Sequence, residues 1–128
     1  MRGIKKKLLK YRLTSYYPAE TSSVTGSGLT TADFEVNEHG WYTYNGKLVM
    51  AGATVYGKFY TNIPGKRYFR YYEEINIKID EIIYSGIILD TCGFCSNVKN
   101  ENRLDLFVSD KQYVIDRGHK GNNMVIVW

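Results

Sequence analysis

The fold class of this chain is decided by one stretch, Glu74-Ile-Asn-Ile-Lys-Ile-Asp-Glu-Ile-Ile-Tyr-Ser-Gly-Ile-Ile-Leu89. Residues 74–79 alternate between apolar and polar side chains, and this period of two predicts a half-buried β-strand. Asp80 and Glu81 then turn the chain, and residues 82–89 are nearly all apolar, which is typical of a strand covered on both faces. The stretch therefore predicts two consecutive strands, the second of them deep inside a β-structure.

Further strands are expected on both sides of this stretch. Residues 11–17 alternate and end at a proline, which is the pattern of a strand followed by a turn. A short strand over residues 41–44 leads into Asn45-Gly46, the strongest two-residue hairpin signal, and residues 47–56 form its partner. A last strand is predicted over residues 124–128.

One helix is predicted, near the end of the chain. Ser109 is a suitable N-cap with Gln112 three residues later, residues 113–115 supply an apolar side, and Gly118 ends the helix. Six or so short strands with one short late helix indicate a mainly β protein, either a small barrel or a sandwich. A closed barrel is favoured because it leaves no hydrophobic edge strand exposed.

Length and charge predict one domain with a basic arm. The chain has 128 residues, close to the usual size of a single domain. Residues 1–12 hold six bases and no acid, which leaves eleven of the 17 bases, against 13 acids, for the rest. We expect a basic N-terminal arm over residues 1–10, most simply a solvated terminus, and a single β-barrel domain over residues 11–128. A basic arm on a mildly acidic body is not the continuous basic stripe of a duplex-binding protein, so no specific nucleic-acid partner is expected.

No targeting or membrane segment is predicted. Only Leu8 and Leu9 follow the basic start before Lys10, too few for the apolar core of a signal peptide. No stretch approaches the roughly 18 apolar residues of a transmembrane helix. If the protein acts outside a cell, we expect lysis, a phage particle or a signal outside this sequence to deliver it.

Cys92 and Cys95 form a C-x-x-C motif with several interpretations. A thioredoxin-type redox site needs this motif at the start of a helix in a βαβ unit, whereas the surrounding sequence is β-rich. A structural zinc site needs two further ligands, and His39 and His119 have no paired spacing. The pair is then either a local disulfide or two reduced thiols, depending on the compartment. No cofactor is predicted.

Asp90 and Asp105 are the acids that best suit chemistry. Asp90 follows the most hydrophobic predicted strand, and Asp105 lies in a second apolar run over residues 104–107. A carboxylate buried there is costly unless it is hydrogen-bonded or protonated. Two such groups close together raise the pKa of one, which keeps an acid ready to donate a proton. The alternative is that each aspartate caps a loop by accepting hydrogen bonds from backbone amides.

The last third of the chain carries a family resemblance. Ile88-Leu-Asp-Thr-Cys-Gly93 is followed, after a spacer, by Arg103-Leu-Asp-Leu-Phe107, the predicted helix and the strand Val125-Ile-Val-Trp128. This order resembles the end of the three-aspartate (3D) domain, and residues 13–17 and 25–28 resemble its opening strand and glycine-rich turn. The resemblance implies a six-stranded double-psi β-barrel related to the catalytic domain of membrane-bound lytic transglycosylase A.

The resemblance also implies an activity and a partner, the glycan strand of peptidoglycan. Asp105 takes the place of the family's catalytic acid/base, and Asp90 that of a supporting residue. The implied reaction cleaves the β-1,4 bond between N-acetylmuramic acid and N-acetylglucosamine without water and closes a 1,6-anhydro ring. The residues expected to contact the glycan are Thr91, Gly93, Trp41 and Tyr56.

Three departures from the family pattern motivate a second hypothesis. Residues 49–53 lack the family's third aspartate, Cys92 replaces a glycine, and the spacer between Asp90 and Asp105 is longer. The candidates for the missing acid are Asp33, Glu35, Glu73 and Glu74. The second hypothesis is a non-catalytic barrel that binds cell wall or belongs to a larger assembly, such as a phage tail, a virion or a secretion complex. Under either hypothesis we expect the protein outside the cell, at the cell wall or in a virion.

Overall fold

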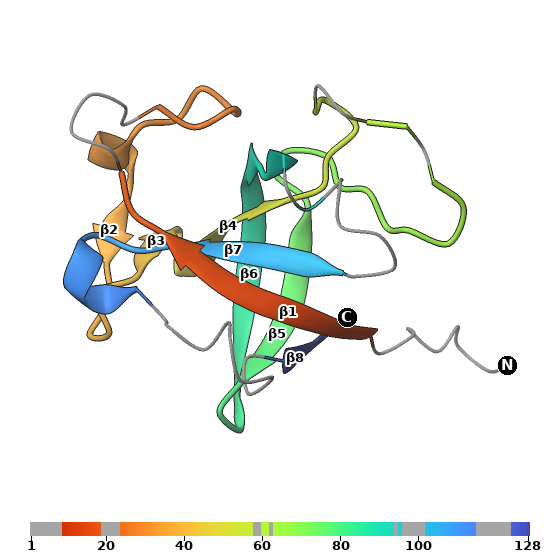
Figure 1. The fold of residues 1–128 in the computed structure, drawn as a ribbon. Coiled ribbons are helices and arrows are strands. Elements are labelled where there is room, and N and C mark those ends of the chain that lie inside the picture. Colours follow the sequence, from red (N-terminus) through yellow and green to blue (C-terminus); the bar gives the residue numbers. More distant parts are fainter. Residues whose placement is uncertain are drawn as a thin grey trace, which may run out of the picture.

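Six strands close into a barrel in the computed structural model, which describes residues 9–18, 24–57, 60–61, 63–93, 95, 102–114 and 124–128 (Figure 1). The barrel strands are β1 (Leu9–Tyr16), β4 (Lys47–Gly52), β5 (Glu74–Ile79), β6 (Ile82–Thr91), β7 (Arg103–Phe107) and β8 (Met124–Val127). They pair in the order β4-β6-β5-β8-β1-β7, and pairing of β4 with β7 closes the ring. The predicted mainly β class and six-stranded barrel are confirmed.

The pairing scheme has an internal two-fold symmetry. Strands β1 and β7 run parallel, as do β4 and β6, whereas the other barrel pairs are antiparallel. The first three barrel strands in chain order, β1, β4 and β5, correspond to the last three, β6, β7 and β8. When each strand is exchanged for its counterpart, every parallel pair becomes a parallel pair and every antiparallel pair an antiparallel pair. The two parallel pairs change places under this exchange, which agrees with the expected double-psi barrel.

The barrel interior is filled by side chains that alternate with outward-facing ones along each strand. Leu104 and Leu106 of β7 lie inside with Leu13 of β1 and Ile77 of β5, all fully buried. Successive side chains of a strand point to opposite faces. Asp105, between Leu104 and Leu106, therefore faces the outside of the barrel wall, where a polar group can reach solvent.

A small hairpin covers part of this outer wall. Strand β2 (Glu35–Val36) pairs with β3 (Tyr42–Tyr44), which turns into β4 at Asn45-Gly46. Both turn residues have positive φ, 50° and 78°, as a type I′ turn requires, so the predicted hairpin turn is confirmed. Phe34, next to β2, packs with Phe107 in a second apolar cluster outside the barrel.

The predicted late helix is wrong. The described residues hold there only a 3-10 turn, η2 (Lys111–Tyr113), whose N-cap is Asp110 and not Ser109. The turn ends because Val114 is extended, with φ −62° and ψ 128°, and packs against the barrel core. The predicted end at Gly118 lies outside the described residues.

The expectation that residues 82–89 are covered on both faces is also wrong for its first half. Strand β4 pairs with β6 only from Gly86 onward, so the start of β6 has β5 as its paired neighbour and extends beyond the barrel wall. Ile82 and Ile83 are accordingly 53% and 60% exposed. Only residues 86–89 are buried on both faces.

The predicted boundary between arm and barrel shifts slightly. Strand β1 begins at Leu9, which pairs with Val127, so the last two residues of the predicted arm belong to the barrel. Residues 1–8 lie outside the described part of the chain. Among the described residues, no helix is both long and apolar enough to cross a lipid bilayer.

Candidate active site

Asp90 and Asp105 lie on either side of Ala51 on the outer wall of the barrel. Ala51 of β4 pairs with Asp90 of β6 on one side and with Asp105 of β7 on the other. A register shift between Met50 and Ala51 brings Asp90 opposite Ala51 while Leu89 stays buried. Because neighbouring strands are about 4.8 Å apart, the two aspartate Cα atoms are roughly 10 Å apart. The methyl group of Ala51 leaves room above the sheet for a larger neighbour.

Tyr16 of β1 is that neighbour. Its ring packs against the cluster that contains Ala51 and stacks on Phe107 with ring centroids 4.5 Å apart. Its hydroxyl donates a hydrogen bond to Oδ2 of Asp90 at 3.3 Å. Burial, followed by the charges of Asp90 and Asp105, raises the pKa of Tyr16 well above its ordinary value. Tyr16 therefore remains a hydrogen-bond donor that links the surroundings of the two acids.

Asp105 combines burial with partial access to solvent, since 19% of its side chain is exposed. Its Oδ1 accepts a hydrogen bond from the hydroxyl of Thr14, and Nε of Arg103 lies 3.7 Å from the same oxygen. Burial raises the pKa of Asp105, Arg103 lowers it and Asp90 raises it again, and the net direction is upward. A carboxyl with a raised pKa keeps its proton to a higher pH and is suited to donate it.

Asp90 is held by three hydrogen-bond donors. The backbone amides of Gly26 and Thr91 donate to its Oδ1 at 2.8 and 2.9 Å, and Tyr16 donates to Oδ2. A Cβ on Gly26 would overlap the hydroxyl of Tyr71 and lie 3.2 Å from Oδ1 of Asp90. Only glycine allows the loop to approach this closely. Asp90 thus caps a loop, as the alternative interpretation expected, and also contributes a negative charge to the surroundings of Asp105.

Three of the predicted glycan contacts lie beside Asp90. The hydroxyl of Thr91 is hydrogen-bonded to Tyr71 at 2.7 Å and to Thr54 at 2.6 Å. The ring of Tyr71 stacks on Tyr56, with centroids 4.4 Å apart, and Tyr56 is 51% exposed. Gly93, two residues after Thr91, is also exposed. An exposed aromatic surface is therefore joined to the strand end that carries Asp90.

The structure places Trp41 opposite Val108, three residues after Asp105, in an isolated antiparallel bridge. Trp41 packs against the barrel core, and its ring lies 5.6 Å from that of Tyr84 and 4.6 Å from that of His39. Within the described residues, these contacts do not connect Trp41 with either aspartate.

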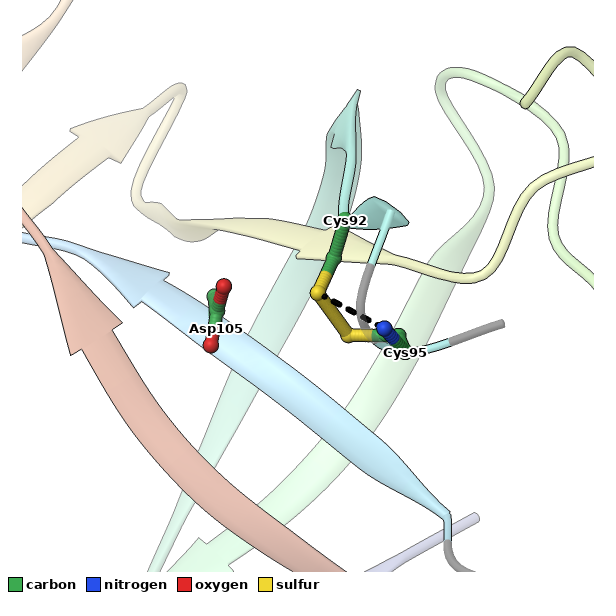
Figure 2. A group of neighbouring side chains, drawn as sticks. All are labelled: Cys92, Cys95 and Asp105. Atoms are coloured by element: carbon green, nitrogen blue, oxygen red, sulfur yellow. Dashed lines mark hydrogen bonds between the residues drawn. A yellow bond between two sulfur atoms is a disulfide. The ribbon is translucent and has the colours of Figure 1, made fainter. Parts of the chain in front are cut away.

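Cys92 and Cys95 form a disulfide beside Asp105. Their Sγ atoms and a carboxylate oxygen of Asp105 all lie within 4.8 Å of one another (Figure 2). The amide of Cys92 donates a hydrogen bond to the carbonyl oxygen of Gly52 at 2.8 Å, which ties the motif to the end of β4. Of the interpretations that the sequence left open, the local disulfide is the one that this structure contains. His119, considered as a metal ligand, lies outside the described residues.

The acids considered as substitutes for the third carboxylate have other surroundings. Asp33 accepts hydrogen bonds within the turn η1 (Thr31–Asp33), and Glu35 is exposed on β2. Glu73 forms an ion pair with an arginine at 3.1 Å, and Glu74 one with a lysine at 3.8 Å. In the part of the chain that the structure describes, none of these interactions brings a third carboxylate to the site.

No family model, curated protein or solved structure matches this chain. The roles of the site residues therefore depend on geometry and chemistry. The strongest geometric fact is that three barrel strands, β1, β6 and β7, place Tyr16, Asp90 and Asp105 around one alanine of β4.

Four residues that hold the two acids are not among the predicted site residues, namely Thr14, Tyr16, Gly26 and Arg103. Alternation along β1 puts Thr14 and Tyr16 on the face opposite Leu13, and alternation along β7 puts Arg103 on the face of Asp105. That signal was present in the sequence. The parallel pairing that sets Thr14 opposite Asp105 was not, because it depends on closure of the barrel.

Proposed function

We propose that this protein cleaves the glycan of the bacterial cell wall as a lytic transglycosylase, with Asp105 as the acid/base. The observation that carries the proposal is the position of Asp105, a carboxyl that is held by Thr14 and Arg103 and is still 19% exposed, while burial raises its pKa. An acid of this kind retains its proton where an ordinary aspartate has lost it, and a substrate oxygen can reach it. The resemblance of the Asp90 and Asp105 motifs to the three-aspartate domain supplies the substrate class.

The proposed reaction uses two proton transfers through one carboxyl. Asp105 donates its proton to the glycosidic oxygen as the bond from that oxygen to C1 of the muramic residue breaks. The resulting carboxylate removes the proton of the muramic 6-hydroxyl, whose oxygen bonds to C1 and closes the 1,6-anhydro ring. Because the nucleophile belongs to the substrate, no second catalytic carboxylate is needed. Asp105 ends the cycle protonated, as it began.

The neighbours of Asp105 have separate proposed roles. Thr14 and Arg103 contact its Oδ1 and stabilise the carboxylate that exists between the two transfers. Asp90 is fixed by the amides of Gly26 and Thr91, so its negative charge has a defined position. That charge keeps the proton on Asp105 before the reaction and stabilises positive charge that develops at C1.

The stacked pair of Tyr56 and Tyr71 is the proposed platform for a sugar ring. A phenol ring offers an apolar face to the C–H groups of a sugar and a polar tip to its hydroxyls. The pair adjoins the site because Tyr71 is hydrogen-bonded to Thr91, the residue after Asp90. The Cys92–Cys95 disulfide supports the proposed place of action outside the cell, at the wall or in a virion, because disulfides persist in oxidising compartments.

Digestion of purified peptidoglycan tests this function. We expect the wild type to release 1,6-anhydro-muropeptides, detected by mass spectrometry, and Asp105→Asn to lower the yield at least about 100-fold, as loss of a general acid does. Asp110→Asn is the matched control, because Asp110 is exposed and its side chain makes no capping hydrogen bond. Its yield should equal that of the wild type.

Two outcomes would refute the proposal. One is the absence of anhydro product from the wild type, and the other is an unchanged yield from Asp105→Asn. Binding to intact sacculi without any product would favour the non-catalytic wall-binding or virion module instead.

A further inference from the structure

Three potential metal-ligand atoms converge on the outer wall of the barrel. Sγ of Cys92, Sγ of Cys95 and a carboxylate oxygen of Asp105 lie within 4.8 Å of one another, from the end of β6, the turn after it, and β7 (Figure 2). In a tetrahedral zinc site, with Zn–S near 2.3 Å and Zn–O near 2.1 Å, ligand atoms are about 3.4–3.8 Å apart. A site of this kind requires the disulfide to open and its two sulfur atoms to separate by roughly 1–2 Å.

The C-x-x-C segment already has the hydrogen bond that a metal-bound sulfur needs. The amide of Cys95 donates to Sγ of Cys92 at 3.1 Å (Figure 2), and an N–H directed at sulfur stabilises negative charge there. Both cysteines are buried, at 5% and 0% exposed. Buried thiolates are unfavourable without a cation, so the reduced pair stays as two neutral thiols until a metal ion replaces their protons.

Asp105 is oriented as a third ligand by residues behind it. Thr14 and Arg103 both contact Oδ1, and such outer contacts fix the direction of a ligating carboxylate. Within the described residues, no hydrogen bond engages its second oxygen, Oδ2. The two soft thiolates, beside one hard carboxylate, select Zn²⁺ over Mg²⁺ or Ca²⁺, which prefer oxygen ligands alone.

We propose that reduction of the Cys92–Cys95 disulfide converts this part of the wall into a zinc site with Cys92, Cys95 and Asp105 as ligands. A dithiol reductant supplies two electrons and two protons, the S–S bond breaks to give two thiols, and the reductant becomes a disulfide. Zn²⁺ then displaces the thiol protons and any proton on Asp105, which are released to solvent. Three protein ligands leave a fourth position for water. The inference does not rest on the proposed glycan cleavage, but bound zinc would occupy the carboxyl assigned to that reaction.

Cobalt binding tests the site without using any glycan. The full chain is reduced, freed of reductant under anaerobic conditions and titrated with Co²⁺ while thiolate-to-cobalt and tetrahedral d–d absorption are recorded. We expect reduced wild type to develop both sets of bands with one metal per chain, and one equivalent of Zn²⁺ to abolish them. The oxidised chain should bind no Co²⁺. Comparing the reduced with the oxidised wild type tests the role of the thiols without any cysteine substitution.

Variants at the third ligand complete the test. Asp105→Asn should weaken Co²⁺ binding roughly tenfold or more, whereas Asp110→Asn should bind as the wild type does. Circular dichroism checks that the reduced chain and both variants remain folded. The proposal is overturned if the reduced chain unfolds, if it binds Co²⁺ no better than the oxidised chain, or if Asp105→Asn binds as the wild type. Anhydro-product formation is measured separately, so the failure of one proposal is distinguishable from the failure of the other.

Discussion

Replacing Thr91 by valine tests how the strand end that carries Asp90 is held. The hydroxyl of Thr91 lies 2.7 Å from that of Tyr71 and 2.6 Å from that of Thr54. Valine keeps the shape of the side chain and removes the oxygen that the other two hydroxyls share. Thr54 is 0% exposed, and among the described residues the amide of Tyr56, at 3.3 Å, remains as a donor to its hydroxyl. Tyr71 is only partly buried, so its hydroxyl can turn to water.

The expected cost follows from these two partners. A buried hydroxyl that loses a partner costs about 1–3 kcal/mol, and Thr54 lies near the low end because the Tyr56 amide remains. Loss of the hydrogen bond to Tyr71 adds about 0.5–1 kcal/mol. We therefore expect Thr91→Val to lower the free energy of unfolding by about 2 kcal/mol. Thr91→Ser keeps the hydroxyl and loses one methyl group, at a cost of about 0.8 kcal/mol or less.

Urea denaturation followed by tryptophan fluorescence measures both variants. The midpoint of Thr91→Val should fall well below that of Thr91→Ser, with an unchanged dependence of stability on urea concentration. Equal midpoints for the two variants would refute the reasoning, because the hydroxyl would then contribute no more to stability than the methyl group does. Thr91 would in that case be available as the glycan contact that sequence analysis expected.

Two further predictions concern Asp105 and a turn glycine. The pKa of Asp105 is raised in the folded chain, so its contribution to stability is fully present below the ordinary pKa of 3.8 and is lost as pH rises through the folded pKa. Asp105→Asn should therefore be more stable than the wild type above the folded pKa and should show no such gain below pH 3.8. Urea denaturation across pH measures the difference. Gly40 and Gly46 both have positive φ, 81° and 78°, but only at Gly40 would a Cβ overlap another residue, the ring of Tyr113. Gly46→Ala should cost about 1 kcal/mol for backbone strain alone, and Gly40→Ala at least about 1 kcal/mol more, so equal melting temperatures would contradict the clash.

The barrel could be predicted because its strands carry local signals. The alternation of residues 74–79 and the Asn45-Gly46 turn each specify structure within a few residues, and both are present as expected. The prediction of the late helix was wrong because it also relied on local signals alone. Its cap and apolar residues satisfied a local pattern, but packing of Val114 on the barrel core holds that residue extended and ends the turn early.

The site could be predicted only in part because its assembly is non-local. Asp90 and Asp105 were identified from their apolar surroundings, which are properties of single strands. Tyr16 reaches Asp90 across 74 residues of sequence and Thr14 reaches Asp105 across 91, through parallel pairing and barrel closure. Trp41 was chosen for its residue type alone, and residue type does not specify neighbours, so its ring contact with Tyr84 could not be predicted from the sequence.

Two departures from the three-aspartate pattern have one physical explanation in this barrel. Ala51 lies between Asp90 and Asp105, in the segment where the resemblance places the third aspartate. Ala51 is 2% exposed and packs in one cluster with Cys95 and with Cys92, which stands where the pattern that the sequence resembles has a glycine. A carboxylate at position 51 would be buried against sulfur atoms and beside two other acids, with a large desolvation cost and like-charge repulsion. In this barrel the disulfide therefore occupies space beside Ala51 that leaves no room for a solvated carboxylate at that position.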